Sequence, residues 1–173
     1  ADRLAACLDA LECVQDVLLR ADCGEVNFRH LVEDLLERVG AVRPERVAME
    51  GPAVSLGWRP AQALGLAIHE LAAHAARNGP LAEPPTGCLA VSWEIAGGAG
   101  GEPVLHLHWR ERGVSEGEGT PAAPGIDREL VETKFDKDFQ VRSDVCFEET
   151  GVSWTVQVPL TSGVGPETAG NEP

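Results

Sequence analysis

The stretch LAIHELAAHAARNGPL, residues 66–81, decides how this chain folds, because it combines an apolar helix with a polar stripe. Ala, Leu and Ile make up most of the helix, and Gly79 followed by Pro80 ends it. Glu70, His74 and Arg77 stand at positions i, i+4 and i+7 and therefore share one helical face. A polar stripe on an otherwise apolar helix indicates a functional site rather than solubility alone.

The composition bounds the class of protein. A chain of 173 residues fits one domain, and 43% hydrophobic residues are enough for a core. With 14 basic and 28 acidic residues the net charge is −14, which excludes nucleic acid and anionic membrane surfaces as partners. No stretch approaches the roughly eighteen apolar residues of a membrane span, and no signal-peptide pattern is visible. We therefore expect no membrane contact by this segment.

Five cysteines are spread along the chain without the C-x-x-C spacing of a zinc site: Cys7, Cys13, Cys23, Cys88 and Cys146. Cys7 and Cys13 are six residues apart on a predicted helix, point in different directions and are not expected to form a disulfide. An odd number of cysteines without metal spacing favours buried, reduced thiols and hence a cytoplasmic protein.

Apolar residues at helical spacing predict three helices in the first half of the chain. The second helix begins at Asn27, a residue type favoured at N-caps, and ends near Gly40. The third covers about residues 60–78, with Pro60 in its first turn. The first covers about residues 2–20 and carries an apolar stripe of Leu4, Leu8, Leu11 and Leu18.

The second half of the chain changes to the alternation of strands. Strands are predicted at about residues 46–50, 54–56, 88–95, 104–109, 140–147 and 153–160, with a mobile loop at 112–125 and a short helix at 127–133. Helices followed by an antiparallel strand cluster predict a two-layer α/β sandwich, a sheet of about five strands backed by about three helices. The chain divides into an N-terminal helix (1–22), the sandwich (26–160) and a disordered tail (161–173).

Both long helices carry a packing expectation. The helix over residues 60–78 is expected to pack on the sheet through Leu64, Ala67, Ile68, Leu71 and Ala75, with Glu70 and Arg77 away from that interface. The leucine stripe of the first helix is expected to be exposed unless a partner covers it, because such stripes rarely face water. Homodimerisation through this helix is therefore expected.

Several stretches match one family pattern in the right order. Residues 69–81 are similar to a helix that reads roughly H-E-L-A-T-N-A-x-K-Y-G-A-L, and Trp109-Arg110-Glu111 fits a W-x-E signature. Residues 46–52 are similar to a first strand with its Gly-Pro turn, and residues 125–132 align with G-F-G-x-x-L-I-E. Over about residues 3–160 the chain thus resembles the HWE class of sensor histidine kinases. His69, Glu70 and the W-x-E motif together are the specific signal.

The resemblance implies the histidine-kinase ATPase (Bergerat) fold, preceded by the end of a dimerisation helix. It implies that Glu70 is the catalytic acid/base or water-positioning group and that Glu111 reads adenine. The family's Asn that holds the magnesium of ATP is replaced by His74, and a Lys is replaced by Arg77. The implied nucleotide-binding set is His69, His74, Arg77, Glu111, Gly113, Gly125 and Asp127, with His74 at the metal position.

Departures from the family pattern cluster at the nucleotide site. An imidazole nitrogen is a poor ligand for Mg²⁺, which prefers oxygen ligands in an octahedron. Asp127 replaces the second glycine of the G-F-G turn and puts a negative charge beside a phosphate-binding backbone. The Gly-Gly-Pro that should follow the W-x-E motif is only Arg112-Gly113-Val114, and the phosphoacceptor helix is absent. ATP and Mg²⁺ are therefore doubtful cofactors.

Some histidines have more than one interpretation. His74 is either a satisfied polar residue or a metal ligand, and His69 is expected to be a packing residue. His106 and His108, two apart on a strand, either lie on an exposed face or bind Zn²⁺ or Ni²⁺ together with Glu102 or Glu111.

Two functions from different classes remain. The first is a degenerate ATPase-like domain of a two-component system, acting in a phosphorelay or in docking a response regulator. The alternative is an active ATP-binding catalytic domain, a protein-histidine kinase that phosphorylates a His on a missing upstream helix. Nucleotide-dependent thermal stabilisation discriminates between them, because a ligand at a hundred times its Kd adds about 2.7 kcal/mol of stability.

Overall fold

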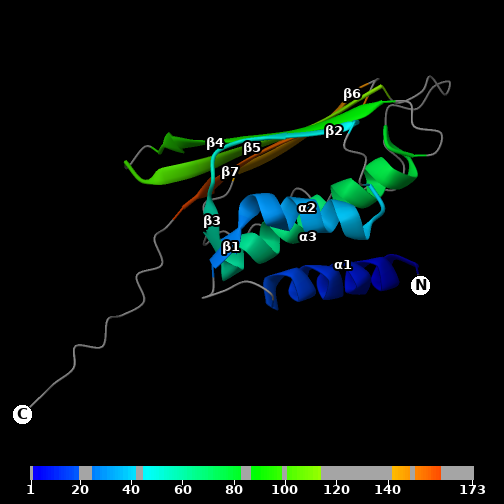
Figure 1. Ribbon diagram of the computed structural model, residues 1–173, viewed down its shortest axis with the longest axis horizontal. Helices are drawn as coiled ribbons and strands as arrows, with labels where there is room; N and C mark the ends of the chain where they lie inside the picture. Colours follow the sequence, from blue (N-terminus) through cyan, green and yellow to red (C-terminus); the bar gives the residue numbers. More distant parts are fainter. Residues whose placement is uncertain are drawn as a thin grey trace, which may run out of the picture.

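The computed structural model describes residues 2–19, 25–41, 45–82, 87–98, 101–113, 142–148 and 151–160. The described elements form a five-stranded sheet, two helices beneath it and a third helix on the far side of those two (Figure 1). The predicted α/β sandwich is confirmed. The short helix expected at 127–133, most of the loop expected at 112–125 and the tail lie outside the described residues.

The large sheet has the strand order β2-β4-β5-β7-β6. Three of its pairings are antiparallel, and β2 alone pairs in parallel, with β4. The strands are β2 (Val47–Glu50), β4 (Cys88–Gly97), β5 (Pro103–Arg112), β6 (Arg142–Glu148) and β7 (Gly151–Pro159). The parallel pair needs a long crossover, and the chain supplies it with a helix, as parallel pairs commonly do.

A second, two-stranded sheet joins β1 (Glu25–Asn27) to β3 (Ser55–Gly57) in antiparallel register. The pattern had predicted β3 but not β1, which is only three residues long. The side chain of Asn27, the last residue of β1, caps α2 (Phe28–Arg38) by accepting a hydrogen bond from the His30 backbone N–H at 3.1 Å. Gly40 then ends this segment at φ +72°, a left-handed conformation that favours glycine. The predicted cap and stop are confirmed.

The central helix is α3 (Trp58–Arg77), which is buried on almost every side. Its five predicted packing residues are fully buried within the core that it shares with α2 and the sheet. Every residue from 67 to 75 is buried, because the sheet lies on one side of the helix and other helices lie on the opposite side. A polar side chain in this part of α3 is therefore held inside the protein.

The N-terminal helix α1 (Asp2–Leu19) packs on α3 and α2 rather than standing alone. Val14, Val17 and Leu18 are buried, and the expectation that Leu18 is exposed is wrong, since only 2% of it is accessible. Gly65 allows this contact, because a Cβ at that position would lie 2.9 Å from Val14 Cγ1. The side chains of Leu4 and Leu8 lie outside what the structure describes.

The predicted Gly-Pro turn after β2 packs against an aromatic side chain. A Cβ at Gly51 would collide with the Trp93 indole, and Trp93 Nε1 donates to the Pro52 carbonyl oxygen at 2.8 Å. The Arg29 guanidinium stacks 4.9 Å above the same ring. Glycine at position 51 is therefore required by close packing.

The described cysteines agree only in part with expectation. Cys13 is buried, whereas Cys88 and Cys146 are exposed on strands of the large sheet, so the expectation of buried thiols is wrong for these two. None of these three described cysteines is in a disulfide bond. Within the described ranges, no helix is long and apolar enough to cross a membrane.

Candidate functional site

The C-terminal half of α3 and the end of β5 bring two predicted site residues together. His74 Nδ1 lies 3.6 Å from Glu111 Oε2, although 37 positions separate them in the sequence. The His74 side chain is 4% exposed and the Glu111 side chain is fully buried. Glu111 faces inward because residues of a strand alternate, and it shares the inner face of β5 with Leu107 and Trp109.

The other carboxylate oxygen of Glu111 is also engaged. Trp109 Nε1 donates a hydrogen bond to Glu111 Oε1 at 3.1 Å, inside the W-x-E motif itself. Among the described residues, neither Glu111 Oε2 nor His74 Nδ1 makes a hydrogen bond. The two atoms face each other beyond hydrogen-bond range, which is an unusual arrangement because buried polar atoms are generally satisfied. Each oxygen of Glu111 therefore faces a nitrogen of the protein.

Two glycines surround Glu111 and were not assigned a role there from the sequence. A Cβ at Gly79 would lie 3.0 Å from Glu111 Oε2, and a Cβ at Gly151 would collide with the Glu111 carbonyl oxygen. Gly79 stands where the similar helix pattern also has a glycine, so the sequence held a signal for it. It had been interpreted only as a helix terminator.

The polar stripe of α3 is buried at Glu70 and His74 and exposed at Arg77. Glu70 is 9% exposed and lies one turn before His74, whereas Arg77 is exposed. Glu70 is buried because α3 is covered on both sides at that point, and its expected position away from the interface with the sheet stays a prediction. Arg77, near the end of the helix, faces a pocket beneath α1 that Glu70 and His74 do not line.

The remaining predicted residues are placed as follows. His69 is 7% exposed, as expected for a packing residue, and it lines the same pocket as Arg77. Gly113 directly follows β5 at φ +84°, where a side chain would be strained. Gly125 and Asp127 lie outside the described residues, so their roles stay predictions.

The metal alternatives find little support. In the part of the chain that the structure describes, no three His, Cys, Asp or Glu side chains are grouped so that they could hold a metal ion. Glu111 faces inward and His108 lies exposed on the other face of β5, so the idea that Glu111 completes a site with His106 and His108 is wrong. Glu94, directly across from His106 in the register, is exposed.

Comparison with known proteins gives one consistent relationship. No model of a known protein family matches the chain. The chain is 28% identical over 167 residues to the blue-light-activated histidine kinase of Brucella ovis, and 27% identical over 160 residues to that of Brucella anthropi. These alignments cover 96% and 92% of this chain but only 33% and 32% of the relatives, so the chain spans about a third of their length.

A solved structure agrees with these relatives. The blue-light activated histidine kinase of Erythrobacter litoralis EL346 superimposes with a TM-score of 0.53, at 16% identity, over 92% of this chain and 54% of that one. At this identity the match bears on the fold alone. The chain therefore shares its α/β-sandwich fold with that histidine kinase and is related in sequence to the blue-light-activated histidine kinases.

Proposed function

We propose that this chain is the ATPase-like domain of a two-component histidine kinase with a degenerate nucleotide site, acting in a phosphorelay or in docking a response regulator. One observation carries the proposal. His74, which replaces the residue that holds magnesium in the family pattern, is buried against Glu111, the residue to which the resemblance assigns the recognition of adenine.

The donor set does not fit magnesium–ATP. Mg²⁺ requires oxygen ligands in near-octahedral geometry, and position 74 offers an imidazole nitrogen. The Glu111 carboxylate faces Trp109 with one oxygen and His74 with the other. Recognition of an adenine amino group requires an accessible acceptor, and the Glu111 side chain is fully buried, so binding a base here would require neighbouring side chains to move. We therefore derive no phosphoryl-transfer step for this chain.

The alternative is an active catalytic domain. Glu70 favours it, because this residue keeps the position of the family's catalytic Glu one turn before His74 and is largely shielded from water. In that case Glu70 would be the acid/base or water-positioning group that the resemblance implies, and a His on an upstream helix would be the phosphoacceptor. A response regulator is the partner under either hypothesis, and a homodimer remains part of the proposal.

A calorimetric titration with Mg–ATP discriminates between the degenerate nucleotide site and the active catalytic domain. Two compromised contacts, each worth about 1.5–3 kcal/mol, should weaken binding by roughly two to four decades relative to an intact site. The unmodified protein is therefore expected to show no binding at low micromolar ATP. The double variant His74→Asn with Asp127→Gly should recover part of the affinity.

The matched control is His30→Asn, which changes an exposed histidine on α2 and should leave nucleotide binding unchanged. Binding of Mg–ATP by the unmodified protein at low micromolar concentration contradicts the degenerate-site hypothesis and supports the active kinase. No recovery in a folded double variant means that the two substitutions are not the cause of the weak binding.

A further inference from the structure

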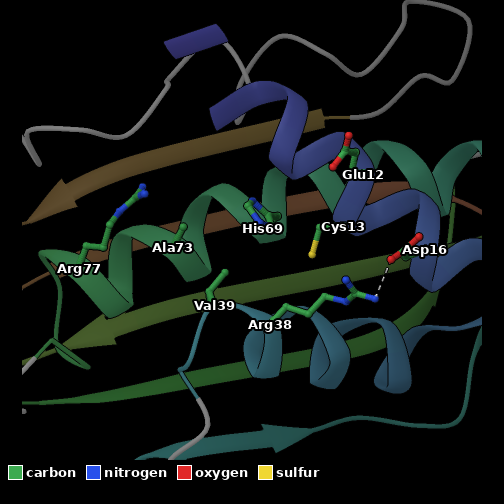
Figure 2. A pocket seen from close by; sticks show the side chains of 8 residues that line it. All are labelled: Glu12, Cys13, Asp16, Arg38, Val39, His69, Ala73 and Arg77. Carbon is green, nitrogen blue, oxygen red and sulfur yellow. Dashed lines mark hydrogen bonds and ion pairs between the residues drawn. The ribbon is translucent and has the colours of Figure 1, made fainter. Parts of the chain in front are cut away.

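A pocket of about 410 Å³ lies where the three helices meet, apart from the Glu111 site. Figure 2 shows its lining: Glu12, Cys13 and Asp16 from α1, Arg38 and Val39 from the end of α2, and His69, Ala73 and Arg77 from α3. Neither His74 nor Glu111 lines it. The volume falls within the range of small-molecule sites.

The pocket lies along the interface between α1 and α3, beyond a point where the two helices approach closely. At Gly65 the helices approach so tightly that a Cβ would lie 2.9 Å from Val14 Cγ1. Farther along α3, His69, Ala73 and Arg77 follow one another at intervals of four residues and therefore share the face that α1 covers. Ala73 has a small side chain, so the middle of this face is hollow.

The base of the pocket is buried and its rim is charged. His69, Cys13 and Ala73 are each at least nine-tenths buried, and Figure 2 shows His69 and Cys13 at the centre of the lining. On the rim, Arg38 and Asp16 form an ion pair with 3.3 Å between Nη2 and Oδ2. This ion pair leaves two of the four charged side chains of the rim, one acidic and one basic, for a ligand.

The other two charged side chains of the rim are unpaired in the part of the chain that the structure describes. Within the described residues, Arg77 and Glu12 have no hydrogen bond and no ion pair. In Figure 2 they lie toward opposite ends of the lining, with His69 between them. A ligand that satisfies both must carry an anionic group at one end and a cationic group at the other.

We propose that this pocket binds a small dipolar molecule, with a carboxylate or similar anion on Arg77 and an ammonium group on Glu12. Guanidinium is well suited to carboxylates, because its N–H donors form a planar fork. The bound molecule bridges α1 and α3, so it stabilises the docked position of α1. His69 and Arg77 also belong to the nucleotide-binding set that the resemblance implies, so binding of the dipolar molecule is measured without nucleotide.

Two NMR measurements on the full chain test the charge requirement, with ε-aminocaproate as the probe. Saturation transfer detects the bound ligand, and protein-observed spectra follow the imidazole signals of His69. Caproate and hexylamine each keep one charged end and serve as matched controls. We expect ε-aminocaproate to bind at about 10 mM or below and to shift the imidazole signals of His69. Both singly charged molecules should bind at least about fivefold more weakly, since each loses one charge-assisted contact at a partly solvated rim.

Variants test the location. Arg77→Gln and Glu12→Gln should each weaken ε-aminocaproate binding by about fivefold to tenfold. Ala73→Leu should abolish binding while the protein keeps its circular dichroism spectrum, because the leucine fills the pocket without changing a charge. Arg59→Gln, an exposed arginine in the first turn of α3, is the control that should change nothing.

Four results would overturn the proposal. The first is binding of caproate or hexylamine as tight as that of ε-aminocaproate, and the second is binding of ε-aminocaproate that leaves the NMR signals of the His69 imidazole unchanged. The third is no binding of ε-aminocaproate to the folded chain at about 10 mM. The fourth is retained binding in a folded Ala73→Leu protein. A mass that doubles with concentration and returns to monomer in Glu12→Gln assigns the pocket to a second copy of the chain instead.

Discussion

The side chain of His74 is one of those that separate this protein from the pattern that it resembles. The sequence identified both His74 and Glu111 as site residues, but it could not predict that they contact each other. Their meeting depends on where the end of β5 lies relative to the last turns of α3, which tertiary packing decides. Local patterns carry no information on a contact of this separation.

Removal of the His74 side chain should destabilise the protein in a way that a small molecule can reverse. His74→Ala leaves a cavity beside a buried carboxylate oxygen, at a cost of about 1–3 kcal/mol. Imidazole added at millimolar concentration should bind in that cavity and restore part of the loss, because a ligand that binds only the folded state stabilises it. Urea unfolding with and without imidazole measures both effects.

The control for this experiment is His30→Ala, which truncates an exposed histidine on α2 and should change stability by less than about 0.5 kcal/mol. An imidazole effect of equal size in the unmodified protein would show that the molecule acts elsewhere. A His74→Ala protein as stable as the original would mean that the His74–Glu111 contact contributes nothing.

At the scale of elements, the sequence predicts the helices and strands whose pattern repeats over several residues, but it does not predict short strands or the order in which strands pair. The cap at Asn27, the stop at Gly40 and the long strands β4, β5 and β7 follow from local chemistry and alternation. The strand β1 is too short to show a period. The parallel pairing of β2 with β4 depends on the path of the whole crossover through α3, which no window of sequence contains.

The first helix shows the same limit. Its apolar stripe was recognised, but the partner of that stripe was sought in a second copy of the chain. The structure buries Leu18, together with Val14 and Val17, against the chain's own α2 and α3, and homodimerisation through this helix stays a prediction. An apolar stripe on a helix shows that something must cover it, and it does not show what does.

Enlarging Gly65 should release α1 without unfolding the sandwich. Gly65→Leu adds four carbons where even a Cβ would lie 2.9 Å from Val14 Cγ1, and overpacking of this kind costs about 1–3 kcal/mol. Hydrogen exchange should therefore become faster in α1 and stay slow in α2. Arg59→Leu, at an exposed position of the same helix, should leave the exchange of α1 unchanged. Equal loss of protection in α1 and α2 would contradict separate docking.

The whole molecule carries twice as many acidic as basic residues, 28 against 14, and this excess has a consequence for stability. Folding brings like charges closer together, so the compact state is destabilised by their repulsion. Ion pairs such as Arg38–Asp16 act in the opposite direction, but an exposed pair contributes only about 0–1 kcal/mol. With a net charge of −14, repulsion should dominate.

Salt should therefore stabilise this protein, and the shape of the dependence identifies the cause. The Debye length falls from about 30 Å at 0.01 M to about 8 Å at 0.15 M, so screening should be largely complete by about 0.2 M KCl. We expect the melting temperature to rise by about 2–4 °C over this range, equivalent to about 1 kcal/mol for a chain of this size, and then to level off. A rise that continues linearly above 0.5 M would instead reflect a general effect of salt on burial of apolar surface. A melting temperature that falls as KCl is added would show that attractive pairs outweigh the acidic excess.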